Sequence, residues 1–343
     1  MNSLKPKYRS LRMHRNVIAF SVSYQRENLL ARGLGFEHIR ELLIRLARPI
    51  LRQGASLAYG GNWEETPENF TYELLRLISA EQEDNSLGGP DTSVPIGLLY
   101  NHSAWPHYLK ISRRTEAQWI NACRIVRVTQ EQAGFSPAEI ASDADYRDAT
   151  PRAIFNAAAT MSAMRRLMMG PMPINIPGAS AQEQIPEVKA RILLGGRLGT
   201  FSGFLPGLFE EALVTLEAER PLYVLGGFGG TAEVLARAIL TRGDRRPEEF
   251  TAPWLAAHNL EFARLLEIAA GFKMPARVRT TEKALTDLFA FIRSARTKPS
   301  RVLRTGLTDA ETRELLQTQN TVVAVKLVRK GLIQMGKLPP LAA

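Results

Sequence analysis

Apolar residues fall along this chain in short runs of strand length that alternate with longer stretches in which they recur every three or four positions. The short runs predict strands, which lie at 17–22, 55–61, 95–100 and 124–129, and from 192 and 221 onward. The longer stretches predict helices, which lie at 36–52, 70–80, 116–122, 151–169, 254–270, 281–294, 309–317 and 320–332, with two more directly after the last two strands. This alternation predicts an α/β fold, a doubly wound Rossmann-like parallel sheet with helices on both faces and a helical C-terminal extension.

Polar and proline-rich stretches interrupt the pattern. Residues 81–93 and 130–150 are polar and predict loops, and the prolines between 170 and 190 predict an ordered loop or flap without regular structure. We therefore expect four parts in the chain. They are a basic N-terminal arm (1–15), a Rossmann-like domain (16–242), a helical extension that packs on it (243–332) and a tail (333–343).

Two of the predicted strands end in a glycine-rich turn that leads into a helix, at 195–200 and at 226–231. Such a turn brings backbone N–H groups close to an anion, and the dipole of the helix adds attraction for negative charge. We predict one nucleotide-sized site, with phosphate at the first turn and a second phosphate or ribose at the second. The same glycines would also serve tight turns with close helix–strand packing. The candidate residues are Gly195, Gly196, Arg197, Gly199, Thr200, Gly227, Phe228, Gly229, Gly230 and Thr231.

Charged residues near the first turn could take part in binding or chemistry. Arg197 could clamp a phosphate or carboxylate, or it could pair with a surface acid. Glu210 and Glu211 open the following helix, where the helix dipole alone would favour acids. They could instead bind ribose hydroxyls or act as a general base. Arg165 could be a further clamp, although its methionine-rich helix also reads as a core helix with a basic edge.

A second strand end carries polar residues that would face the same edge of the sheet. Tyr59, Gly60, Gly61 and Asn62 follow one strand, and Ser23 follows the first. In open α/β sheets ligands bind at the carboxyl ends of the strands, so these residues predict the opposite wall of the site. Asn62 could bond a ribose or base, and Tyr59 could stack.

Composition narrows the function classes. The net charge is +10, and no acidic residue occurs in residues 1–26 or after Glu314. A basic chain of this kind could bind an anionic nucleotide or nucleic acid, or its basic termini could simply be solvated. The single cysteine excludes a disulfide framework and fits a cytoplasmic protein. We find no signal peptide, membrane span, P-loop or metal-ligand spacing, and we predict no metal.

Six segments, taken together and in order, resemble the SLOG superfamily, the Rossmann-like group named after Smf/DprA and LOG proteins. They are SVSYQRENL (21–29), ASLAYGGNW (55–63), SAMRRLM (162–168), GGRLGTFSGFLPGLFEEAL (195–213), PLYVLGGFGG (221–230) and GLTDAETRELLQTQNTVVAVKLVRKGL (306–332). The branch associated with bacterial conflict systems is the most similar. This chain departs from the PGGxGTxxE motif of LOG hydrolases, because Leu194 replaces the proline and two residues separate the glycine pair from Gly199.

The resemblance implies a nucleotide or NAD-derived ligand, and three functions follow from it. The first is a sensor that binds a signal such as a cyclic ADP-ribose in antiphage defence and acts through self-assembly as a homo-oligomer or through an effector protein. The second is a nucleotide N-glycosidic hydrolase in which Glu210 or Glu211 activates water. A lesser alternative is a DprA-like DNA-associated protein.

Overall fold

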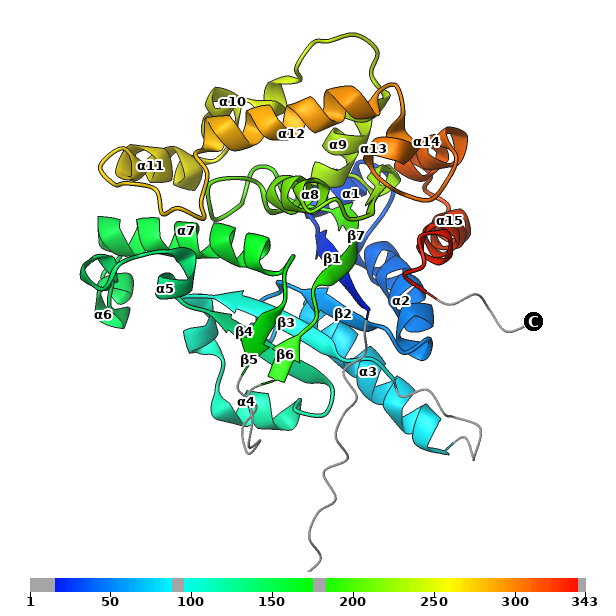
Figure 1. Ribbon diagram of the computed structural model, residues 1–343, viewed down its shortest axis with the longest axis horizontal. Coiled ribbons are helices and arrows are strands. Elements are labelled where there is room, and N and C mark those ends of the chain that lie inside the picture. The colour runs from blue at the N-terminus through cyan, green and yellow to red at the C-terminus, as the bar shows by residue number, and fades with distance from the viewer. Residues whose placement is uncertain (1–15, 88–95, 175–182, 339–343) are drawn as a thin grey trace, which may run out of the picture.

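Six parallel strands form one sheet at the centre of the molecule (Figure 1). The computed structural model describes residues 16–87, 96–174 and 183–338, so the predicted N-terminal arm and the end of the predicted tail lie outside the described residues. The strands follow the order β4–β3–β2–β1–β7–β8. Their bounds are β1 (Val17–Ser23), β2 (Ser56–Tyr59), β3 (Leu99–Ala104), β4 (Cys123–Val128), β7 (Val188–Gly195) and β8 (Leu222–Leu225). The predicted α/β class with a parallel sheet is confirmed.

The chain reverses its direction of travel across the sheet beside β1. It runs outward from β1 through β2 and β3 to β4, and then returns to place β7 on the other side of β1. In a doubly wound sheet this change of direction opens a crevice at the carboxyl ends of the two central strands. The position of the site therefore follows from strand order.

Helices cover both faces of the sheet. Ile18, Phe20 and Val22 of β1 point into the core under α2 (Phe36–Arg52), α3 (Phe70–Leu87) and α15 (Thr321–Gln334). The alternate residues Val17 and Ala19 point to the opposite core, under α7 (Pro151–Leu167). Around β7 and β8 that opposite face is covered by α8 (Gly207–Glu217), α9 (Gly230–Leu240) and α12 (Thr281–Ala295). The period of two along the strand thus divides the apolar residues between two cores.

The remaining helices connect or extend these layers. They are α1 (Arg26–Leu30), α4 (Arg113–Gln118), α5 (Gln130–Ala133), α6 (Asp143–Arg147), α10 (Ala252–His258), α11 (Leu260–Ala269), α13 (Pro299–Val302) and α14 (Asp309–Gln317). Helix α12 shares one apolar core with β7 and β8, and the Tyr223 hydroxyl of β8 donates to the carbonyl of Thr305 at 3.1 Å. The C-terminal helices therefore pack directly against the sheet. Within the described ranges, no helix is both long and apolar enough to cross a membrane.

Four predictions about local structure are wrong. The predicted loop over 81–93 is helical as far as residue 87, because α3 continues into it. Residues 130–150 contain α5 and α6, which begin with capping boxes at Thr129 and Ser142 and are too short to show an apolar stripe. The segment 170–190 contains the antiparallel strands β5 (Met172–Ile174) and β6 (Glu183–Ile185), because a two-stranded ribbon tolerates proline on its open edge. The single helix expected over 254–270 divides into α10 and α11, since the Asn259 side chain accepts the N–H of Phe262 and starts a new helix.

Candidate functional site

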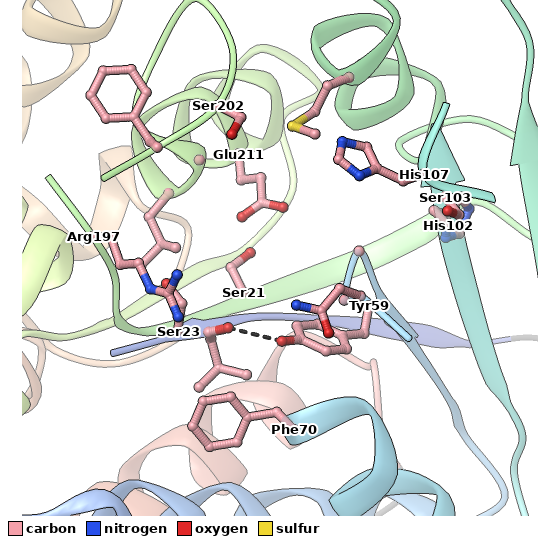
Figure 2. A pocket seen from close by; sticks show the side chains of 18 of the residues that line it. Ser21, Ser23, Tyr59, Phe70, His102, Ser103, His107, Arg197, Ser202 and Glu211 are labelled. Atoms are coloured by element: carbon pink, nitrogen blue, oxygen red, sulfur yellow. Dashed lines mark hydrogen bonds between the residues drawn. The ribbon is translucent and has the colours of Figure 1, made fainter. Parts of the chain in front are cut away.

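A cleft of about 500 Å³ opens at the carboxyl ends of β1, β2 and β3, under the loop that joins β7 to α8 (Figure 2). This is the crevice expected beside β1, and its size suits a nucleotide-sized molecule. Nine of the predicted residues line it. They are Ser23, Tyr59, Gly60, Gly61, Asn62, Arg165, Arg197, Thr200 and Glu211.

One wall is built by the end of β2. The Tyr59 hydroxyl donates to the carbonyl of Val22 at 3.0 Å, which fixes the ring against β1 (Figure 2). Burial raises the pKa of this hydroxyl, so Tyr59 stays neutral. A Cβ atom on Gly61 would lie 2.0 Å from the Tyr59 ring, and only glycine fits there. Tyr59 therefore offers the cleft a rigid ring edge rather than a titrating group.

The loop after β2 is held by side-chain amides. Asn69 donates to the Asn62 side-chain oxygen at 2.7 Å, and Thr71 donates to the Asn62 carbonyl at 2.7 Å. The buried Asn101 donates to the carbonyl of Gly61 at 3.2 Å and accepts from Trp63 at 2.8 Å. These bonds use the oxygens of Asn62 and leave its side chain exposed at the cleft rim.

The opposite wall carries a cation. The Arg197 Nε donates to the carbonyl of Tyr24 at 3.0 Å, and the side chain is exposed. Figure 2 places its guanidinium at the cleft beside Ser23. No carboxylate of the described residues lies within ion-pair distance of it, so the predicted alternative of a surface ion pair has no partner here. Arg197 can thus present its terminal N–H groups to an anion.

The two acids that begin α8 point to different places. Glu210 forms an ion pair with Arg165 at 2.5 Å, and both side chains are nearly buried. Glu211 faces the cleft (Figure 2) and is 7 % exposed. Arg165 lines the cleft as predicted, but Glu210 already neutralises it. Glu211 is consequently the acid of this pair that a bound molecule would meet.

A fully buried arginine lies beneath Glu211, and the sequence analysis missed it. Arg191 of β7 donates to the hydroxyls of Ser21 and Thr215, each at 2.8 Å, and its Nη1 lies 3.6 Å from the Glu211 carboxylate. Burial lowers the pKa of its guanidinium, although Glu211 opposes this effect. The predicted strand begins at Ile192, four residues after the start of β7 at Val188, and so leaves Arg191 out. An arginine directly before the apolar run 192–194 was the available signal.

Two histidines of the β3 end also line the cleft. The ring of His102 is buried, and its Nδ1 lies 3.3 Å from the Tyr100 carbonyl. Burial lowers the pKa of His102 to about 3, so the ring is neutral and its Nε2 is left as an acceptor. Burial also lowers the pKa of His107. Neither histidine was among the residues predicted from the sequence, and in the described ranges no cluster of three metal-ligating side chains occurs.

The glycines of both turns serve packing between chain segments. Gly196 has φ +101°, its N–H donates to the Ser23 carbonyl at 2.7 Å, and an added Cβ would lie 2.7 Å from Thr231. At the second turn an added Cβ on Gly227 would lie 2.1 Å from the Thr318 carbonyl. Several predicted residues do not line the cleft, namely Gly195, Gly196, Gly199, Gly227, Phe228, Gly229, Gly230, Thr231 and Glu210. The first turn still positions Arg197 and Thr200, whereas the second turn packs against the first through Gly230 and Thr231 and does not line the cleft.

Comparison with known families agrees with this arrangement. A family model described as SLOG cluster2 matches residues 12–315, which include the sheet, the cleft and the helices as far as α14. The chain belongs to the SLOG superfamily. The resemblance seen in six sequence segments is confirmed over most of the chain. SLOG domains form a family of nucleotide-binding sensor and LOG-like domains. None of the curated proteins matches this SLOG chain.

Proposed function

We propose that the cleft binds a nucleotide or NAD-derived signal, such as a cyclic ADP-ribose, and that the protein is a sensor in antiphage defence. The observation that carries this proposal is the exposed guanidinium of Arg197, which stands at the strand-order reversal without a carboxylate partner among the described residues. A cation in this position attracts phosphate. The output is proposed to be self-assembly or contact with an effector protein.

The cleft offers groups for the different parts of a nucleotide. Arg197, Thr200 and Ser202 present N–H and hydroxyl groups for phosphate. Glu211 and the neutral His102 present acceptors for ribose hydroxyls or for the amino group of a base. Donors for phosphate and acceptors for a sugar or base therefore line the same cleft, which supports a nucleotide-like ligand.

The first prediction tests the phosphate contact. Arg197→Ala should weaken binding of ADP-ribose or cyclic ADP-ribose by roughly 10- to 100-fold, because charge-assisted hydrogen bonds are lost. Binding is measured by titration calorimetry and by thermal stabilisation. The matched control is Arg114→Ala, an exposed arginine on α4 outside the cleft, which should bind as the wild type does. Equal affinity of Arg197→Ala and wild type for every bound probe would remove the basis of the proposal.

A second candidate function is N-glycosidic hydrolysis, favoured by the position of Glu211 in the cleft. A buried carboxylate beside a bound sugar could stabilise positive charge at the anomeric carbon and accept a proton from water. Because Arg165 already pairs with Glu210, Glu211 is the residue to test.

The second prediction separates the two functions. A sensor should bind its ligand and leave it intact, so incubation with NAD, AMP and ADP-ribose should release no base, as followed by chromatography. A hydrolase should release base, and Glu211→Gln should lower the rate by about 100-fold or more, since the base catalyst is lost. Release of base by the wild type that Glu211→Gln abolishes would replace the sensor with the enzyme.

A further inference from the structure

The cleft loop, residues 196–206 between β7 and α8, contributes four residues to the site but contains no helix or strand. They are Arg197, Thr200, Phe201 and Ser202. A loop of this kind has a defined shape only if other parts of the molecule fix its backbone. Its first residues are fixed by β1, through the bond from the Gly196 N–H to the Ser23 carbonyl.

The second half of the cleft loop is held by the C-terminal helices. The Asn259 side chain donates from Nδ2 to the carbonyl of Phe201 at 3.1 Å, and the residue is 4 % exposed. The same side chain accepts the Phe262 N–H on its oxygen at 3.1 Å, which starts α11. The rings of Phe201 and Phe262 also pack together, with centroids 5.1 Å apart. One side chain therefore joins the start of a helix to the wall of the cleft.

A second buried contact repeats this arrangement three residues further along the loop. The Thr281 hydroxyl, in the first turn of α12, donates to the carbonyl of Phe204 at 2.9 Å. Thr281 is 5 % exposed and Phe204 is 1 % exposed, so water does not compete for this carbonyl. The guanidinium of Arg165 approaches Gly203, between the two contacts, and Gly207, at the start of α8.

We propose that Asn259 and Thr281 are positioning residues, through which the C-terminal helices set the position of Phe201 and of its neighbours Thr200 and Ser202, and thereby the affinity of the cleft for its nucleotide ligand. The inference rests on the function proposed above. It adds that the C-terminal helices control the affinity of the cleft. Without these donors the loop samples other conformations. A ligand that binds only one loop conformation then binds more weakly, in proportion to the reduced population of that conformation. The two residues touch the loop and act through it.

Asn259→Ser separates the two roles of the side chain. Serine is a good N-cap and keeps an acceptor for the Phe262 N–H, but it lacks the amide donor that reaches Phe201. Thr281→Val is a second, nearly isosteric variant that removes only the hydroxyl donor. The matched control is Asn320→Ser, because Asn320 starts α15 by accepting the N–H groups of Val322 and Val323 and lies outside the cleft.

The experiment combines affinity with loop dynamics in the full-length protein. Calorimetric titration with ADP-ribose and cyclic ADP-ribose should show about three- to tenfold weaker binding for Asn259→Ser and Thr281→Val, and no change for Asn320→Ser. Hydrogen exchange of the amides at 198–204 in the unliganded protein should be faster in the first two variants only. A change in both measurements at these two positions supports the positioning role.

The outcomes separate this inference from the proposed function. If the wild type binds neither probe, the proposed function fails, and the exchange measurement alone decides whether Asn259 and Thr281 hold the loop. If the wild type binds and both variants bind equally well, the positioning role is overturned. Unchanged exchange at 198–204 in both variants overturns it as well.

Discussion

At the scale of single residues, burial determines which ionisable groups beneath the cleft are charged and which are neutral. Arg191 is fully buried, and its charge is balanced by two hydroxyls and by Glu211. Removing one partner of such a buried pair leaves an uncompensated charge, which is strongly destabilising. His102 nearby avoids this cost by remaining neutral. The charges that a ligand meets are therefore those of Arg197, of Glu211 and of the exposed Glu64 and Glu68, which also line the cleft.

His102 leads to a prediction about pH. Its pKa is about 3 in the folded protein and near 6.5 in the unfolded chain. As the pH falls below 6.5 the unfolded chain takes up a proton that the folded protein does not, so the free energy of unfolding decreases. His102→Asn should reduce this loss between about pH 7 and about pH 4.5, as measured by urea unfolding. An identical slope for His102→Asn and the wild type would contradict the assignment.

At the scale of elements, the two glycine turns have the same sequence signature and different positions. The first turn leads into the cleft loop, while the second is covered by the backbone near Thr318. A strand–glycine–helix pattern predicts a close backbone approach at both, and it does not say whether a ligand or the protein itself approaches. Both glycine turns match the alternative stated in the sequence analysis, namely tight turns that pack closely against neighbouring segments.

The first turn allows a matched test of this interpretation. Gly196→Ala should lower the free energy of unfolding by roughly 1–3 kcal/mol, because it places a side chain at φ +101° and against Thr231. Gly199→Ala should change it by less than about 0.5 kcal/mol, since an added Cβ would meet only the His258 carbonyl at 3.4 Å. Chemical denaturation measures both. Equal losses for the two variants would contradict a packing role specific to Gly196.

The same scale explains which elements the sequence predicts. The stripe of apolar residues over 36–52 predicts α2 with the bounds that the structure has. Helices α5 and α6 are too short to show an apolar period. The sequence features that indicate them are the N-cap residues Thr129 and Ser142. Asn259 is a cap of the same kind, which the apolar pattern of 254–270 concealed.

At the scale of the whole molecule, the sequence predicts the parallel sheet and part of the site. The carboxyl ends of the predicted strands led to Ser23, Tyr59 and Asn62, which the structure brings together with Arg197. Strand order is not encoded locally, so nothing before folding indicated that β7 pairs with β1. Arg191 was missed for this reason, because its partner Ser21 is far away in the chain. The bond from Asn259 to Phe201 likewise joins distant residues, which no local pattern indicates.

The pairing of β1 with β7 also has a consequence for synthesis on the ribosome. Ala19 lies beside Arg191, and the chain between them contains the whole other half of the sheet. The edge of β1 that pairs with β7 therefore remains unpaired until most of the protein has been translated. Asn259 and Thr281 emerge later still. A prematurely terminated product that ends before them would lack the contacts that shape the cleft loop, so the cleft takes its full shape only in chains that extend well beyond the sheet.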